Sequence, residues 1–106
     1  MKFRELKQAI YEDFAEQWRK TGHTKAEPVS YFARLFSQEP GRVKKAIKQM
    51  LIEGILIVCE ETPGDEPYYR LSPMTYMMTV AGLESMGEAP LPPDGESWIQ
   101  AAGIFA

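Results

Sequence analysis

Residues 41–51 alternate between apolar and basic side chains at the spacing of an α-helix. Four positive charges and no negative charge fall within residues 41–48, in a chain whose formal net charge is -3. On a helix, the apolar side chains would share one face and the cations the other: Val43, Ala46, Ile47, Met50 and Leu51 against Arg42, Lys44, Lys45 and Lys48. The segment therefore predicts a helix that packs on a core with one side and presents a cationic surface on the other.

Two segments before this helix also have helical patterns. Residues 3–20 place large apolar side chains three or four residues apart, and Gly22 follows where a left-handed helix end is common. Pro28 fits the first turn of a second helix, whose buried face would be Val29, Phe32, Ala33 and Phe36. After a break at residues 37–40, Pro40 opens the basic helix, which we expect over about 40–53. The connection at 21–27 is polar and holds the single histidine, His23, which we expect to be solvated.

The second half of the chain begins with a predicted hairpin. Residues 55–60 and 67–71 read as short strands, joined by a segment rich in Pro, Gly and acidic residues. Residues 74–86 have a helical tendency, with a stripe formed by Met74, Met77, Met78, Ala81 and Met86. A proline-rich linker and an apolar tail follow, and this tail must pack on its own domain or on a partner. We therefore expect one domain over residues 1–86 and a linker with tail over 87–106.

Residues 29–58 resemble the helix-turn-helix of winged-helix regulators, of the small prokaryotic, phage or plasmid type. Ala33 and Val43 match the small and branched residues, ten positions apart, that let the two helices of this motif cross closely. The junction around Gly54 and Ile55 is similar to the passage from recognition helix to wing. The turn position that the family often fills with Gly holds Ser37. The resemblance implies a mainly α fold with a small β-hairpin wing, the winged helix-turn-helix.

The resemblance also implies a sequence-specific DNA-binding protein, acting in transcription regulation, that reads the major groove of double-stranded DNA with the helix at about 40–53. The candidate DNA-binding residues are Ser30, Tyr31, Arg42, Lys44, Lys45, Lys48 and Gln49. Gln49 could contact an adenine edge through its amide. For Ser30 and Tyr31 two interpretations stand side by side: phosphate contact, or helix capping and core packing.

Acidic residues in the presumed wing support an alternative function. Residues 1–59 carry 11 Lys/Arg against 7 Asp/Glu, whereas residues 60–106 carry 1 against 8. The wing holds four of these carboxylates, which phosphates would repel: Glu60, Glu61, Asp65 and Glu66. The alternative is a winged-helix adaptor, or a plasmid or phage replication or partition factor, that binds a protein partner through its acidic wing and apolar tail.

The methionine stripe and the tail also predict self-association. Methionine side chains fill irregular contacts, so the stripe is either core or a homodimer interface. Two-fold DNA sites require paired reading helices, which favours the homodimer. The candidate dimer or partner interface residues are Met77, Met78, Trp98, Ile99, Ile104 and Phe105.

Several classes of function find no support in the sequence. It has no Ser or Cys with a plausible histidine base, no glycine-rich phosphate loop and no metal-ligand spacing, so we expect neither an enzyme nor a cofactor. The longest apolar run, residues 55–59, is far below the ~20 residues that span a bilayer. The N-terminus lacks an apolar signal core, and the single cysteine, Cys59, fits a reducing compartment. We therefore expect a cytoplasmic protein.

Overall fold

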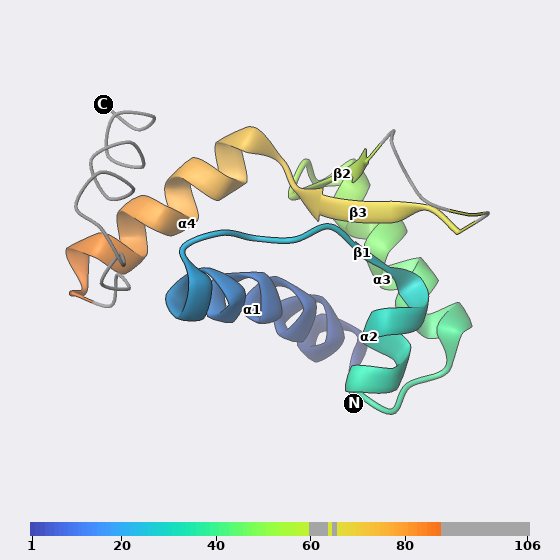
Figure 1. Cartoon of the computed structure of the whole chain (residues 1–106). Coiled ribbons are helices and arrows are strands. Elements are labelled where there is room, and N and C mark those ends of the chain that lie inside the picture. Colours follow the sequence, from blue (N-terminus) through green and yellow to red (C-terminus); the bar gives the residue numbers. More distant parts are fainter. Residues whose placement is uncertain (60–63, 65, 88–106) are drawn as a thin grey trace.

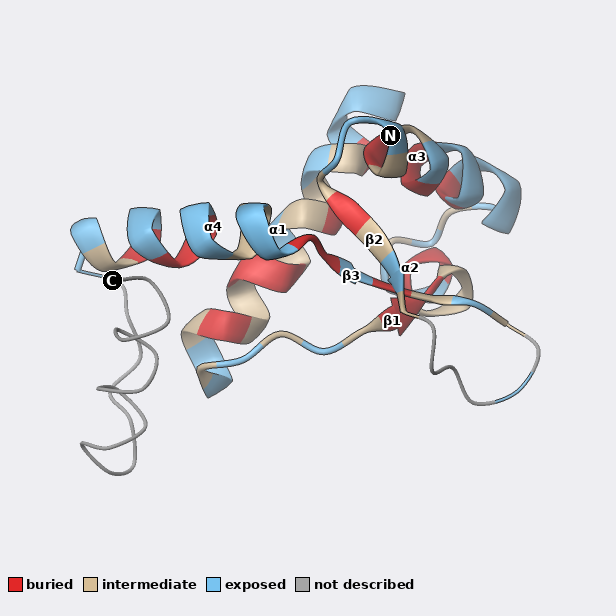
Figure 2. Ribbon diagram, turned by 90° about the horizontal axis from the view of Figure 1, so that it is seen from above, coloured by how far each residue is buried: buried red, intermediate tan, exposed pale blue. Residues whose placement is uncertain are grey.

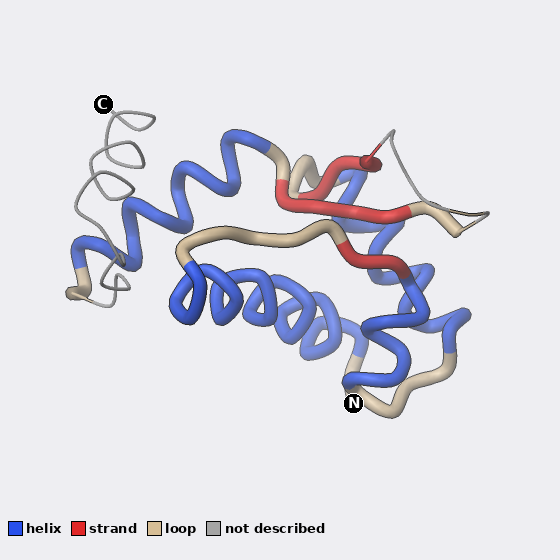
Figure 3. Tube along the Cα trace, viewed as in Figure 1, coloured by secondary structure: helices blue, strands red, loops and turns tan. Residues whose placement is uncertain are grey.

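The computed structural model describes residues 1–59, 64 and 66–87, which form four helices and a three-stranded antiparallel sheet (Figures 1 and 3). In chain order these are α1 (Phe3–Thr21), β1 (Glu27–Pro28), α2 (Val29–Leu35), α3 (Pro40–Ile52), β2 (Leu56–Cys59), β3 (Tyr68–Leu71) and α4 (Pro73–Ser85). The expected mainly helical architecture with a small β-hairpin is confirmed.

The main core lies where α1, α2 and α3 meet the sheet. Its fully buried side chains come from the apolar stripes predicted for these helices: Leu6, Ile10, Phe14, Phe32, Val43, Ala46, Ile47 and Met50. Phe32 is fully buried at the centre, and its ring lies 5.6 Å from that of Phe14 and 6.3 Å from that of Phe36. Helical periodicity therefore identifies the buried faces of these three helices correctly.

Local backbone geometry explains where the first helices end. Gly22 ends α1 with a left-handed φ of 82°, and its N–H bonds the Trp18 carbonyl at 2.8 Å. Ser37, in the turn between α2 and α3, has a φ of 52°. A left-handed residue in this turn explains why a glycine would be favoured there.

The sheet contains one strand that the sequence does not predict. β3 lies between β2 and β1, with Val58 opposite Tyr69 on one side and Glu27 opposite the same Tyr69 on the other. Residues 27 and 28 were expected to be the end of a polar connection and the first turn of a helix. Pro28 instead pairs with Tyr68 and immediately precedes α2. Two residues are too short for a recognisable strand pattern, and their partner lies about forty positions away.

Helix α4 leaves the sheet and packs along the second half of α1. Ser72 caps it: its Oγ accepts a hydrogen bond from the Thr75 N–H at 3.3 Å and donates to the Gly54 carbonyl at 2.7 Å. Trp18 and Ala15 of α1 form a second apolar cluster with Val80 and Leu83. This second cluster joins α4 to the rest of the domain.

Candidate nucleic-acid interface

Helix α3 presents its cations to solvent because its apolar side is committed to the core. Val43, Ala46, Ile47 and Met50 are buried against α1 and α2. Arg42, Lys44, Lys45 and Lys48 are exposed, and we call these four residues the basic face. Figure 2 shows α3 exposed on its outer side, at one end of the molecule.

The basic face keeps its positive charge without carboxylate partners. Among the described residues, none of its four cations forms an ion pair, whereas Lys7 and Arg19 on α1 both do. Arg42 donates to Gln38 Oε1 at 3.0 Å and to the Met1 carbonyl, both uncharged acceptors. Unpaired cations on one rigid helix create a positive potential that attracts a polyanion.

The end of α3 departs from the expected pattern. Ile52 is 78% exposed, and it lies on the same side of the helix as Lys45 and Lys48, seven and four residues earlier. Gln49 is half-buried beside Glu53. The pKa of the Glu53 carboxyl is lowered by its hydrogen bond with Lys7, with a smaller contribution from Gln49. The Gln49 side chain is therefore less accessible to a ligand than the exposed lysines around it.

Ser30 and Tyr31 make hydrogen bonds within the protein. The Ser30 N–H and hydroxyl both donate to the Glu66 carboxylate, at 3.0 and 2.8 Å. The Tyr31 hydroxyl donates to Asp13 at 3.0 Å. Burial, and then this bond to Asp13, raise the pKa of Tyr31 to about 12. Of the two interpretations left open by the sequence, packing fits Tyr31, which contacts the main core, whereas Ser30 does not cap α2, whose N-cap is Pro28.

Glu66 has a structural role that the charge pattern does not reveal. It belongs to the hairpin and fastens that hairpin to the start of α2. The other wing carboxylates, Glu60, Glu61 and Asp65, lie outside the described residues. The Glu66 carboxylate therefore contributes to the fold, through two hydrogen bonds with Ser30.

Replacing Glu66 with Ala is expected to lower the free energy of unfolding by about 2 kcal/mol, because both hydrogen bonds to a charged acceptor disappear. Urea denaturation followed by circular dichroism measures this change. Glu12, exposed on α1, supplies the matched control, and Glu12→Ala is expected to stay within about 0.5 kcal/mol. Equal losses for the two variants would show that the Ser30–Glu66 contact contributes nothing.

The methionines of α4 do not belong to the core of this chain, and the core interpretation of the stripe is wrong. Met74 and Met78 are 70% and 68% exposed, while Thr79, Val80 and Leu83 are buried. No charged residue occurs between Arg70 and Glu84, so both sides of α4 are apolar and either could face α1. The Thr79 side does so, and its hydroxyl lies 2.6 Å from that of Tyr11.

The exposed side of α4 remains as a candidate interface. We define the methionine face as Met74, Met77, Met78 and Ala81, all of them exposed. Figure 2 shows this helix exposed along the side that points away from α1. The remaining interface candidates, Trp98, Ile99, Ile104 and Phe105, lie outside the described residues, as do the linker and tail from residue 88 onward.

In the described part of the chain, His, Cys, Asp and Glu side chains form no group that could hold a metal ion. None of its helices is long and apolar enough to cross a membrane. No protein-family model, no curated protein and no solved structure was found to match this chain.

Proposed function

We propose that this protein is a sequence-specific DNA-binding protein of the winged-helix type that acts in transcription regulation. The observation that carries the proposal is the basic face, four exposed cations on one helix without ion pairs to any described residue. The 13 residues of α3 extend over ~20 Å, and the major groove of B-DNA, ~12 Å wide, admits a helix. The short turn from α2 and the hairpin after α3 fit the same fold type.

Different residues of α3 would make different contacts. Lys44, Lys45 and Lys48 suit phosphates, because an ammonium is a compact charge on a flexible stem. Arg42 can bond the two acceptors of a guanine edge. Ile52 would contact a thymine methyl group, which explains why an isoleucine is exposed beside two lysines.

The proposal includes pairing of two copies through the methionine face. One recognition helix makes few base contacts, and the chain's net charge of -3 gives little long-range attraction to DNA. Two recognition helices about one DNA turn apart, ~34 Å, would double the contacts and select a palindromic site.

A protein-binding adaptor is the second candidate function. The methionine face supports it, because an uncharged helix surface that is largely exposed is typical of a protein interface. An adaptor of this kind would not need the basic face. Substitutions on α3 therefore distinguish the two functions.

The test begins with selection of duplexes from a randomised pool by the wild-type protein, followed by fluorescence anisotropy at several salt concentrations. Replacing both Lys44 and Lys48 with Ala should weaken binding and reduce the slope of log K against log salt by about two, if both lysines contact phosphate. The matched control is Lys20→Ala with Lys25→Ala, which removes the same charge from exposed positions outside α3.

The control should retain nearly all of the wild-type affinity at moderate salt. Equal losses for the two double variants would mean that only net charge matters. Failure to enrich any duplex, or full affinity of the α3 variant, would exclude α3 as a DNA-reading helix.

A further inference from the structure

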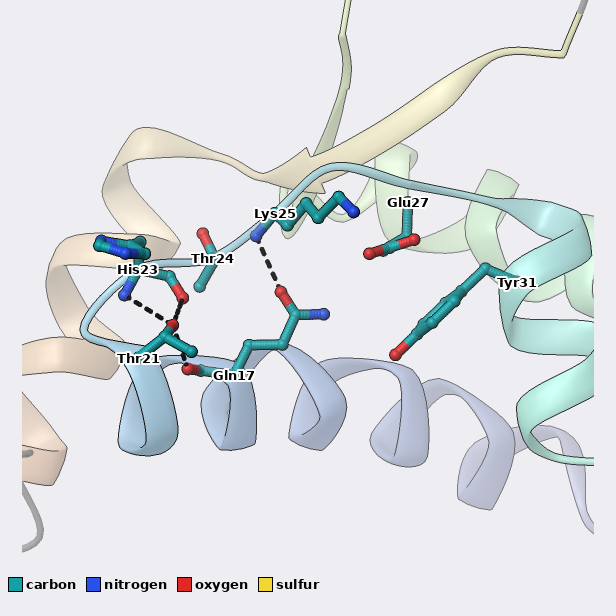
Figure 4. Close-up of a pocket in the computed structure, with 7 residues that line it drawn as sticks. All are labelled: Gln17, Thr21, His23, Thr24, Lys25, Glu27 and Tyr31. Atoms are coloured by element: carbon teal, nitrogen blue, oxygen red, sulfur yellow. Dashed lines mark hydrogen bonds between the residues drawn. The ribbon is translucent and has the colours of Figure 1, made fainter.

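A pocket of about 300 Å³ lies between the C-terminal half of α1, the connection that follows it and the start of α2 (Figure 4). Gln17 forms part of its floor, Lys25 and Glu27 come from the connection and β1, and Tyr31 closes one end. The volume falls at the lower end of the range for small-molecule sites. The basic face and the methionine face contribute no residue to it.

Glu27 is the unusual member of this pocket. The residue is 9% exposed, and among the described residues no group donates a hydrogen bond to its carboxylate or forms an ion pair with it. Its backbone is held in β1 opposite Tyr69, and its side chain lines the pocket. Burial raises the pKa of the Glu27 carboxyl, and the nearby charge of Lys25 only partly opposes this. Partial desolvation of an unpaired carboxylate is unfavourable, and a cation beside it would offset that cost.

Two of the other polar side chains around the pocket, those of Gln17 and Tyr31, have partners within the protein. The Gln17 side chain accepts from the Lys25 N–H at 2.8 Å and donates to Asp13 at 3.0 Å. The Tyr31 hydroxyl donates to the same carboxylate. These bonds fix the Gln17 amide and the Tyr31 ring in place. The oxygens of Glu27 are thus the charged acceptors of the lining that remain open to a ligand.

The charges and the ring favour an organic cation over a metal ion. Asp13 and Glu27 bring two negative charges, against the single positive charge of Lys25. The Tyr31 ring offers a surface on which an ammonium or guanidinium group is attracted. A calcium ion would need six to eight oxygen ligands, and Glu27 is the single carboxylate that lines the cavity.

We propose that this pocket binds a small organic cation, a primary amine or a guanidinium compound, whose charged group pairs with Glu27 beside the Tyr31 ring. Glu27 belongs to β1 and Tyr31 to α2, so the ligand would connect the sheet, α2 and α1. Binding itself does not depend on the proposed function. An effect of the ligand on DNA affinity does rest on that function, and the experiment therefore measures binding on the protein without DNA.

The probes are agmatine and n-butylamine, with butan-1-ol as a neutral molecule of matched size. Binding is followed by ¹H–¹⁵N nuclear magnetic resonance titration of the full chain and by the shift in melting temperature. We expect saturable changes at residues 17, 25, 27 and 31 with the two cations and none with the alcohol. No saturation by either cation, or equal changes with the alcohol, would overturn the proposal.

Two substitutions test the assigned group. Glu27→Gln should reduce cation affinity at least tenfold, whereas Glu12→Gln, which removes a charge from the exposed side of α1, should preserve it. Glu27→Gln is expected to fold at neutral pH, because a group whose pKa is raised by folding destabilises the native state once it is ionised. Unchanged affinity in Glu27→Gln would show that this carboxylate does not bind the cation.

Lys25→Ala provides an independent result if Glu27→Gln proves difficult to produce. Lys25 is exposed, and the positive charge of its ammonium partly offsets the negative charge of Glu27 that would attract a cationic ligand. Its removal should raise cation affinity several-fold. Weaker binding in Lys25→Ala would contradict the pairing of the ligand with Glu27.

Discussion

Replacing Phe32 with Ala is expected to lower the free energy of unfolding by about 3–5 kcal/mol, as for other fully buried Phe side chains. Phe32 is 0% exposed, and the rings of Phe14, Tyr31 and Phe36 surround it. Its removal therefore leaves a cavity at the junction of α1 and α2 that several fixed rings cannot fill. The total free energy of unfolding of such a domain is ~5–15 kcal/mol, so the folded state of the variant would be only marginally stable at 37 °C. Urea denaturation followed by circular dichroism gives the value.

Leu35→Ala is the matched control, because Leu35 lies on the same short helix and is 48% exposed. It should cost less than about 1 kcal/mol, since little apolar area returns to water. A small loss for Phe32→Ala, similar to that of the control, would mean that α2 does not pack on α1 as described.

Introducing lysines at Met77 and Met78 is expected to convert the proposed dimer to a monomer. In a two-fold interface each residue occurs twice, so the pair of substitutions affects four methionines. Burying each methionine side chain contributes ~1.5–3 kcal/mol, so the free energy of dimer formation becomes less favourable by about 6 kcal/mol or more. Repulsion between the four new charges would add to this loss. We expect a second copy of the chain to cover the methionine face, because two uncharged helix faces can pack together without burying a charge.

Light scattering measures the mass of the full chain, which should be twice 12.0 kDa for the wild type and 12.0 kDa for the variant. The control introduces lysines at Leu35 and Val58, which are exposed apolar residues outside α4. A wild-type monomer at micromolar concentration would rule out the dimer. A version that ends at Gly95 tests the tail: a dimer that survives the truncation assigns the interface to the helices alone.

Helix α3 and its basic face are predictable from sequence because the information is local. The apolar and basic residues of 41–51 are three and four positions apart, and one helical geometry sorts them onto two faces. The same reasoning predicts α1 and α2 and the hairpin strands to within one or two residues. For α4 it predicts the helix but not its buried side, since apolar residues occur all round it.

The pocket around Glu27 could not be predicted in the same way. In the sequence, Glu27 is a carboxylate between Ala26 and Pro28, and its place at the end of a polar connection between two helices accounts for it without a pocket. Its environment depends on β1 pairing with β3 and on Tyr31 reaching Asp13, contacts between residues 42 and 18 positions apart. Similarly, Ser30 and Glu66 lie 36 positions apart and meet only when the hairpin folds against α2.

The sequence by itself determined which segments form the four helices and the two hairpin strands, and which side of α1, α2 and α3 is apolar. These properties follow from the repeat of side chains along one element. The tertiary structure alone decided that the Thr79 side of α4 faces α1, that Ser30 and Tyr31 bond inside the protein, and that Glu27 lines a pocket without a hydrogen-bond partner among the described residues. Each of these depends on the distance between groups that are remote in the chain, and only the packing of the folded elements sets that distance.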